Sequence, residues 1–311
     1  MPSLRILRPM RKTFVLLCLL ILAVGCAQGP SLKKGAVILA SDVLALQFAP
    51  DGLTLAMGSN DKSLRLIDVD SGVERANLPG HEKGVWALAY SPDNKMLASA
   101  ASDGTVRIWN PDQKRLLQVL KPGGYSVAFR PDSKRLAVGS DYKIRIYNTE
   151  NWTLFKEWAE PDGNVFTVAF SEDGKKLASG TSKGLKVWDA DAGTQMSAHV
   201  ENNQSVRAIC FPTEEELAAY YQGYGVVLLR ARDGSARASH PENGTVAFSG
   251  NGKRAIVASA SLSTLLKDTE AWKDLGSIKL PLGTVNAVTV STDGKLAAVA
   301  GIRDVTVLKL P

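Results

Sequence analysis

The chain has 311 residues, of which 45% are hydrophobic and 22% are charged, and its mean hydropathy is −0.04. This composition is that of a globular protein and excludes both a disordered chain and a protein with several membrane spans. The length would suit two average domains, but regular repetition along the chain favours one closed all-β domain.

Residues 1–25 have the pattern of a secretory signal. Basic residues come first, at positions 5–12, and an unbroken apolar run follows from Phe14 to Val24. The small residues Ala23-Val24-Gly25 then stand directly before Cys26. A membrane-spanning helix needs about 20 apolar residues, so the run is too short to span a bilayer comfortably. The alternatives are an ordinary signal peptide that contains a cysteine and an uncleaved short anchor.

The segment Ala23-Val24-Gly25-Cys26 resembles the lipobox of bacterial lipoproteins. The resemblance implies transfer of a diacylglyceryl group to the Cys26 thiol, cleavage before that residue and fatty acylation of the new N-terminus. Residues 26–35 are then a short tether to the membrane. The residue after the cysteine is Ala27, whereas an Asp at this position marks an inner-membrane lipoprotein in enterobacteria. By similarity to this sorting rule, Ala27 implies that the protein lies on the periplasmic face of an outer membrane.

The leader also accounts for most of the positive charge. The formal net charge is +6, but four cations and no acids lie in the leader, which leaves 33 basic and 31 acidic residues and a net charge of about +2. A chain with so small an excess of cations lacks the charge that nucleic-acid binding requires. No nucleic-acid partner is therefore expected.

Of the three cysteines, only Cys210 lies in the body of the chain beyond Cys26, because Cys18 would leave with the signal. Cys210 has no partner for an intramolecular disulfide, and it sits in an apolar run with Ile209 and Phe211. We expect a buried small hydrophobic side chain, with a reactive thiol as the less favoured alternative.

Residues 36–311 repeat one pattern seven times, and the copy from His81 to Asn110 is the clearest. It reads as three short strands joined by the turns Ser91-Pro92-Asp93-Asn94 and Ser102-Asp103-Gly104. The aspartates of the first turn recur 42, 39 and 41 residues apart, at Asp51, Asp93, Asp132 and Asp173. A period near 40 residues with three or four strands in each unit is typical of propeller blades.

The second unit resembles the WD40 repeat through Gly80-His81, Leu97-Ala98-Ser99, Asp103-Gly104 and Trp109-Asn110, and the fourth unit through Leu177-Ala178-Ser179-Gly180 and Trp188-Asp189. The resemblance implies a seven-bladed WD40-type β-propeller. It also implies a structural hydrogen-bonded tetrad of His81, Ser99, Asp103 and Trp109. The other units lack at least one member, so packing between blades is expected to hold most of the ring together.

The ends of the chain predict how the ring closes. The last unit offers three strands, near residues 285–290, 295–300 and 305–310, and the run Ala36-Val37-Ile38-Leu39-Ala40 has no unit of its own. We expect this run to be the outer strand of the last blade, which removes the open edge between the first and last blades.

The sequence offers no recognisable catalytic, metal or cofactor site. Asp68-Val69-Asp70-Ser71-Gly72 and Asp189-Ala190-Asp191-Ala192-Gly193 resemble calcium loops but lack the acid at the twelfth position, so we interpret them as turns. His199 and His240 fall in predicted outer strands and have no zinc-like spacing. The protein is therefore expected not to be an enzyme and to bind no metal or cofactor.

One row of residues is predicted to bind a partner. The residues that enter the inner strands of units one to five are Leu44, Trp86, Tyr125, Phe166 and Arg207. In WD40 proteins this position lies near the channel mouth and often contacts partners, and aromatic and Arg side chains dominate interface hot spots. Packing against adjacent blades is the alternative. Tyr220, Tyr221 and Tyr224 would extend the row.

The sequence is therefore interpreted as a non-catalytic protein-protein interaction scaffold, monomeric by itself, lipid-anchored in a bacterial cell envelope and bound to other envelope proteins. The alternative is a propeller with an enzyme, small-ligand or glycan site in its channel. Such an enzyme would gather acids or histidines on its inner strands, and the sequence has no such ring.

Overall fold

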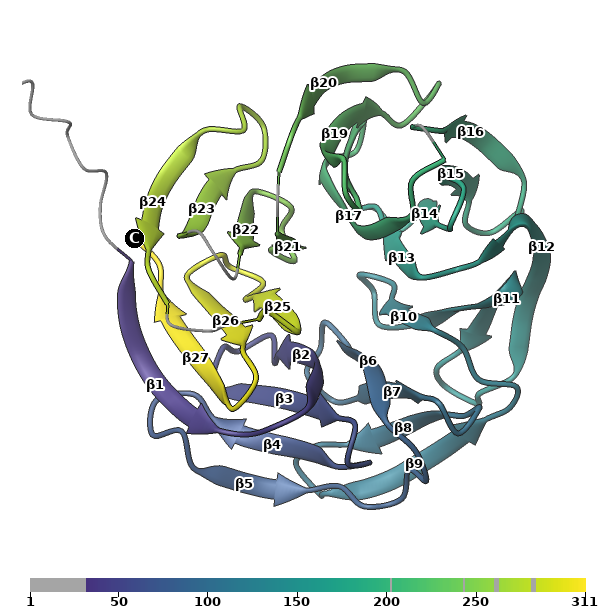
Figure 1. Cartoon of the computed structure of the whole chain (residues 1–311). Coiled ribbons are helices and arrows are strands. Elements are labelled where there is room, and N and C mark those ends of the chain that lie inside the picture. Colours follow the sequence, from purple (N-terminus) through teal and green to yellow (C-terminus); the bar gives the residue numbers. More distant parts are fainter. Residues whose placement is uncertain (1–31, 202, 243, 260–262, 281–283) are drawn as a thin grey trace, which may run out of the picture.

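The computed structural model describes residues 32–201, 203–242, 244–259, 263–280 and 284–311. Throughout these residues the regular structure is β-strand, in seven antiparallel sheets arranged as a ring (Figure 1). The predicted seven-bladed propeller is confirmed. The leader, including Cys26, lies outside the described residues.

The strands follow one another from the channel outward in each blade. Blades one to three comprise β2–β5 (Val43–Phe48, Thr54–Ser59, Leu64–Asp68, Glu74–Asn77), β6–β9 (Val85–Tyr90, Leu97–Ala101, Val106–Asn110, Arg115–Leu120) and β10–β12 (Ser126–Phe129, Arg135–Asn148, Leu154–Asn164). Blades four to six comprise β13–β16 (Thr167–Phe170, Lys176–Gly180, Leu185–Asp189, Gln195–His199), β17–β20 (Val206–Thr213, Glu216–Tyr221, Gly225–Arg230, Ala236–His240) and β21–β24 (Thr245–Phe248, Arg254–Ala258, Thr264–Asp268, Asp274–Ile278). Blade seven comprises β25–β27 (Ala287–Val290, Leu296–Ala300, Asp304–Lys309) and β1 (Lys33–Leu39).

Blade three has three strands because both of its middle strand segments belong to β11, which folds back on itself. Residues 136–139 of β11 pair with β10, and residues 141–147 of the same strand pair with β12. The Thr149 amide donates to the Lys134 carbonyl at 3.2 Å, so the two ends of β11 lie side by side, and the backbone reverses near Tyr142, whose φ is 55°. The blade therefore keeps the propeller geometry, with its two middle strand segments joined by a tight turn.

The recurring Pro-Asp-Gly turns close the hairpins between the first two strands of the blades. In blade two the Asp93 carboxylate accepts the Lys95 amide at 3.2 Å, and Asp173 accepts the Lys175 amide at 3.0 Å in blade four. The backbone of the residue after the acid is in the left-handed region, with φ of 62° at Asn94 and 71° at Gly174. This backbone favours Gly and Asn, which explains their recurrence at that position.

The two calcium-like loops are turns, as interpreted from the sequence. The carboxylate of Asp68 accepts the amide of Ser71 at 2.8 Å, and that of Asp189 accepts the amide of Ala192 at 2.7 Å. Each acid thereby caps the turn between the third and fourth strands of its blade.

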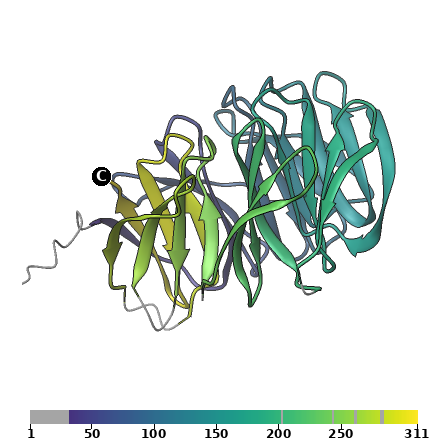
Figure 2. The ribbon, with the colours of Figure 1, turned by 90° about the horizontal axis from the view of Figure 1, so that it is seen from above.

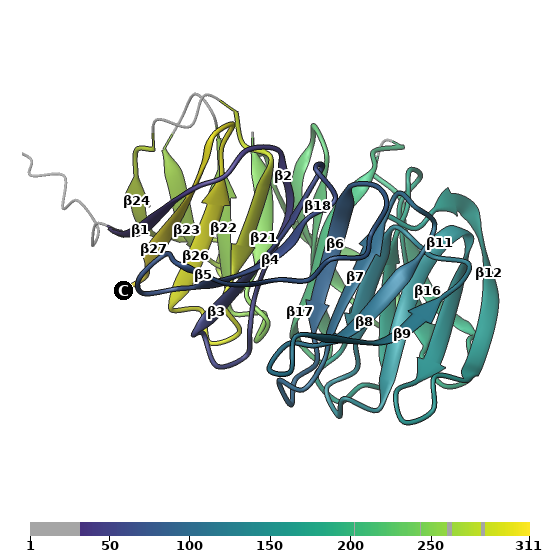
Figure 3. The same cartoon turned by 90° about the horizontal axis from the view of Figure 1, so that it is seen from below.

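The predicted ring closure is confirmed. β1 pairs with β27 in antiparallel register, with Val37 opposite Thr306 and Ile38 opposite Val305. Figure 3 shows the two strands side by side at the edge of the ring, and Figure 2 shows the strands running between its two faces. The strand begins at Lys33, so the last three residues of the predicted tether belong to the sheet.

The core is divided among the spaces between neighbouring blades. Between blades one and two, Leu64 and Leu78 meet Val85, Leu97 and Trp109. Every pair of neighbouring blades shares such a buried apolar cluster. Cys210 is buried in the cluster between blades five and six, as predicted. Burial raises the pKa of its thiol, which disfavours the reactive thiolate.

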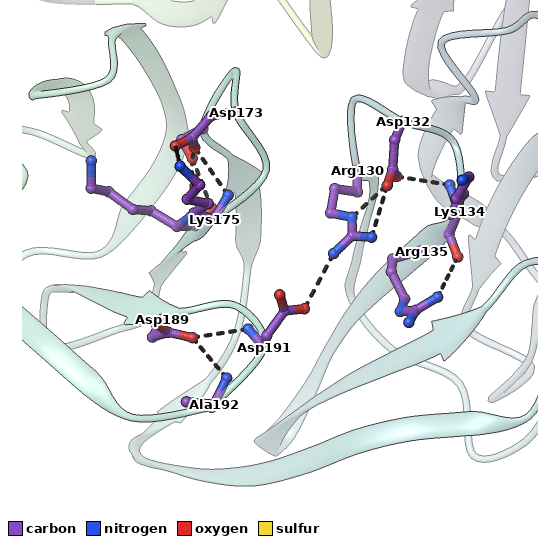
Figure 4. A network of polar contacts seen from close by, with 11 residues as sticks. Arg130, Asp132, Lys134, Arg135, Asp173, Lys175, Asp189, Asp191 and Ala192 are labelled. Atoms are coloured by element: carbon purple, nitrogen blue, oxygen red, sulfur yellow. Dashed lines mark hydrogen bonds and ion pairs between the residues drawn. The ribbon is translucent and has the colours of Figure 1, made fainter.

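Polar contacts at the turns supplement this packing. Figure 4 shows Arg130 and Asp132, from a turn of blade three, beside Asp191 of blade four. The Arg130 guanidinium donates to Asp132 at 2.7 Å and to Asp191 at 3.2 Å. Because Asp191 is largely exposed, this ion pair contributes little to stability.

Candidate interaction surface at the channel mouth

The predicted row comes together as a stack of side chains around the channel mouth. The ring centroids of Trp86 and Tyr125 lie 5.3 Å apart, and those of Tyr125 and Phe166 lie 6.4 Å apart. The guanidinium carbon of Arg207 lies 4.0 Å from the centroid of the Phe166 ring, in a cation-π contact. Four consecutive blades thus contribute one side chain each to a continuous ladder.

Hydrogen bonds hold two members of the ladder at their polar ends. The Trp86 indole N–H donates to the Gly124 carbonyl at 3.3 Å, and the Tyr125 hydroxyl donates to the Asp141 carboxylate at 2.7 Å. That hydrogen bond, together with burial, raises the pKa of Tyr125. The phenol is therefore a neutral donor at physiological pH, and the ring orientations are fixed before any partner arrives.

Arg207 ends the ladder with a charge. Its Nε donates to Gln222 Oε1 at 2.9 Å, which orients the guanidinium over the Phe166 ring. Burial lowers the pKa of Arg207, but an arginine remains charged throughout the physiological range. The ladder therefore offers apolar faces at one end and a cation at the other.

A cavity of about 290 Å³ opens beside the ladder in the channel. Its lining includes Leu44, Trp86, Phe166 and Arg207 of the predicted row, whereas the third blade contributes Ser126 instead of Tyr125. Leu44 and Trp86 are 39% and 37% exposed, so a partner at the mouth could bury both. Leu44 lies on the channel wall outside the ring ladder.

Both interpretations of the row describe part of its geometry. The rings do pack against their neighbours across blade boundaries, yet Trp86 and Arg207 keep exposed surface at the mouth. The proposed extension through blade five is wrong for two of its three tyrosines. Tyr221 is fully buried and Tyr220 is 7% exposed, because both side chains pack into the spaces beside blade five.

The four residues of the expected tetrad lie within hydrogen-bond distance of one another in blade two. His81 Nδ1 lies 2.8 Å from Asp103 Oδ2, and His81 Nε2 lies 2.7 Å from Ser99 Oγ. The indole N–H of Trp109 donates to the same Ser99 oxygen at 2.8 Å. Ser99 and Trp109 lie on the two middle strands β7 and β8, Asp103 lies in the turn between them, and His81 lies in the loop before β6, so the tetrad holds the middle strands of the blade to the loop that enters it.

The charge states in the tetrad suit this geometry. Burial lowers the pKa of His81, and Asp103 offsets that effect in part. Burial acts to raise the pKa of Asp103, but hydrogen bonds from Thr105, the Glu82 amide and His81 outweigh it and lower that pKa. A neutral His81 can donate from Nδ1 to the carboxylate and accept the Ser99 hydroxyl at Nε2, so every polar atom has a partner.

Blade four has a related cluster that the sequence analysis missed. The Trp188 indole donates to Ser179 Oγ at 2.8 Å, as in blade two, but Ser179 donates to Glu160 at 2.9 Å. Glu160 is fully buried, and Lys186 Nζ donates to it at 2.6 Å. Glu160 thus stands in the place of the tetrad histidine. The sequence feature that could have revealed this cluster is a lysine on the strand of Trp188, together with acidic residues before the inner strand of blade four.

The two remaining histidines lie in outer strands, and each packs against an aromatic ring. His199 is 6.0 Å from Tyr221 and His240 is 5.7 Å from Trp272, between ring centroids. Across the part of the chain that the structure describes, no three His, Cys, Asp or Glu side chains are grouped to hold a metal ion. In the same residues, no helix has the length and apolar character needed to span a membrane.

A family model described as "WD domain, G-beta repeat" (WD40) matches the chain over residues 36–68, 72–110, 119–148 and 152–189. These segments contain the first four blades except for β16 and most of β9, together with most of the closing strand β1. The match therefore agrees with the resemblance seen in the second and fourth units.

Several curated proteins are similar over part of the chain. A segment of 114 residues, 35% of this chain, is 34% identical to 27% of the human WD repeat and SOCS box-containing protein 1. A segment of 128 residues, 40% of this chain, is 30% identical to 38% of the small ribosomal subunit protein RACK1y of Oryza sativa subsp. japonica. Mouse coronin-7 is 38% identical over 82 residues, which are 26% of this chain and 9% of coronin-7. The matches thus span well under half of each relative.

Proposed function

We propose that this seven-bladed propeller, whose first four blades match the WD40 repeat, works as a non-catalytic protein-protein interaction scaffold. WD40 propellers are generally scaffolds of this kind. A closed ring of short antiparallel sheets is rigid and has no unpaired edge between its first and last blades. Its loops and channel mouth are therefore the surfaces on which partners would assemble.

The ladder of Trp86, Tyr125, Phe166 and Arg207 carries the proposal. Its side chains are held in place by stacking and hydrogen bonds, so little conformational entropy is lost when a partner docks. Large aromatic faces next to a cation are typical of interface hot spots. The partner surface suited to it combines apolar side chains with an acidic or carbonyl group opposite Arg207.

We also propose that the protein is lipid-anchored at Cys26 on the periplasmic face of a bacterial outer membrane, where it binds other envelope proteins. The support is the sequence alone: basic residues, a short apolar run, small residues and a cysteine, followed by Ala27. Few residues separate Cys26 from Lys33, where β1 begins. Each extended residue spans about 3.5 Å, so the anchor would hold the propeller close to its membrane.

The binding proposal is tested with Trp86→Ala combined with Phe166→Ala, by crosslinking in native envelopes and identification of captured proteins. Loss of a specific captured protein, with an unchanged melting temperature, is the expected result. Leu154→Ala is the matched control, because Leu154 is an exposed apolar residue in the outer strand of blade three. If the folded double variant captured the same proteins as the wild type, the ladder would serve only in packing between blades.

Purified cell-wall sacculi discriminate the glycan alternative. If the ladder binds protein, the intact chain should not co-sediment with sacculi, and the double variant should behave as the wild type does. Co-sedimentation that is lost in the double variant would instead assign the surface to glycan.

The anchor is tested separately by metabolic labelling with an alkyne analogue of palmitate. The intact chain is expected to take up label and to partition with membranes, whereas Cys26→Ser is expected to do neither. Cys210→Ser serves as the control, because that cysteine is buried. Equal labelling of the Cys26→Ser variant would contradict lipidation at this residue.

A further inference from the structure

A basic residue occupies the second position of the third-strand segment in each of blades one to four: Arg65, Arg107, Arg145 and Lys186. Three of these four cations have carboxylate partners: Arg65 pairs with Asp61 at 2.9 Å, Arg145 with Glu157 at 2.6 Å, and Lys186 with Glu160 and with Asp162 at 2.6 Å each. The fold therefore compensates a charge at this position from within the chain.

Arg107 departs from this pattern. Among the residues that the structure describes, no carboxylate lies within 4.0 Å of its guanidinium, and its buried Nε has no hydrogen-bond partner. The cause is visible in the register of the outer strand. Glu157 lies opposite Arg145 in blade three, but Val119 lies opposite Arg107 in blade two. A planar donor group is left without an acceptor.

The unpaired guanidinium faces a pocket of about 570 Å³ on the flank of blade two, separate from the channel. The pocket is lined by Glu82, Asp103, Thr105, Arg107, Val119 and Lys121. Gly80 lets the guanidinium lie beside the backbone, since a Cβ built on it would come within 2.5 Å of Arg107 Nη1. This volume readily holds a phosphate or a carboxylate-bearing side chain.

The two acidic residues in the lining do not pair with the Arg107 guanidinium, so neither takes the place of an anionic ligand. Asp103 already accepts from the Glu82 amide, the Thr105 amide, the Thr105 hydroxyl and His81, at 2.7–3.0 Å. Glu82 is an exposed residue. Lys121 is exposed as well and directly follows the strand of Val119, so it can supply a second cation to a group bound at Arg107.

We infer that this pocket binds an oxyanion, a carboxylate or phosphate group of a ligand, with Arg107 as the fixed cation and Lys121 as the second one. Guanidinium and oxyanion form charge-assisted hydrogen bonds, often bidentate, which are stronger than bonds between neutral groups. The inference does not depend on the ladder at the channel mouth, and it adds a second recognition site that is lined by different residues.

The test is a titration of the whole protein at constant ionic strength with inorganic phosphate and, separately, with N-acetylglutamate, followed by the ¹⁵N-¹H resonance of Arg107 Nε. We expect a saturable shift of that resonance, and the anion that saturates it identifies the source as phosphate or carboxylate. Calorimetric affinity for that anion should fall about tenfold or more in Arg107→Gln, because a charge-assisted hydrogen bond is lost. Arg115→Gln, an exposed residue at the start of the neighbouring outer strand β9, should bind as the wild type does.

A second variant keeps the inference testable if Arg107→Gln fails to fold. Val119→Glu places a carboxylate opposite Arg107, in the register that Glu157 has opposite Arg145. It should abolish binding of the anion and raise the melting temperature, because the acceptor is then supplied by the chain. No saturable shift with either anion, or unchanged affinity in Val119→Glu, would overturn the inference.

Discussion

The carboxylate of Glu160 is fully buried and lies 2.6 Å from the ammonium of Lys186, in a cluster built on the Trp188 indole and the Ser179 hydroxyl. Glu160 lies on the outer strand of blade three and Lys186 on blade four, so the pair links two blades. A buried ion pair is sensitive to the loss of one partner, because the other charge is then left uncompensated in a low dielectric.

Lys186→Met is therefore expected to lower the free energy of unfolding by about 3 kcal/mol or more. The double variant with Glu160→Gln should recover much of this loss, since no buried charge remains. Chemical denaturation measures both values. Lys175→Met is the control, because that lysine pairs with Asp173 at 3.5 Å on the surface and should contribute about 1 kcal/mol or less. Equal effects of the two lysine variants would contradict this account.

The tetrad of blade two should make stability depend on pH. The folded pKa of His81 lies below its ordinary value near 6.5. The unfolded chain therefore takes up a proton before the folded chain does, and stability is lost as the pH falls through this value. Asp103, whose folded pKa is also lowered, adds a further loss in stronger acid, below an ordinary value near 3.8.

His81→Gln is expected to destabilise the protein by about 1–3 kcal/mol at pH 7.5, through lost hydrogen bonds. The difference from the wild type should be smaller at pH 5, because only the wild type loses the contribution of His81 on acidification. Denaturant unfolding at the two pH values measures it. A difference that stays constant or grows at pH 5 would show that His81 is charged in the folded protein.

Ring closure depends on β27, which pairs with β26 on one side and β1 on the other. Truncation of Thr306–Pro311 removes the middle of this sheet and opens an edge between the first and last blades. We expect loss of soluble folding, measured by yield and by cooperative melting. Removal of Pro311 alone, beyond the end of β27, is the control. A truncated chain with an unchanged cooperative transition would contradict the role of β27 in closing the ring.

Gly180 marks a close approach between blades four and five. A Cβ built there would come within 2.7 Å of Val206 Cγ1 and of Thr167 Cγ2. Gly180→Ala is expected to cost about 1–3 kcal/mol through overpacking, although alanine is otherwise the better strand residue. Thermal unfolding measures the change. The pair Gly180→Ala with Val206→Ala should recover part of it, and no loss in the single variant would contradict the packing argument.

Much of the architecture could be predicted because it depends on local chemistry. The Asp51, Asp93 and Asp132 turns recur at a regular spacing, and each turn is a short-range structure that its own residues specify. The closing strand was predicted for a similar reason, since residues 36–40 form an apolar run that has no unit of its own. The buried Tyr220 and Tyr221 were misjudged because local sequence does not show which face of a blade meets a neighbour.

The sequence by itself determined the number of blades, their turns, the closure and the members of the blade-two tetrad. Only the tertiary structure decided which charges meet. Glu160 replaces a histidine beside Ser179, and Arg107 has Val119 opposite it where Arg145 has Glu157. The physical reason is that strand pairing and blade packing join residues distant in sequence, so compensation of a buried charge depends on register and distance, which no single segment encodes.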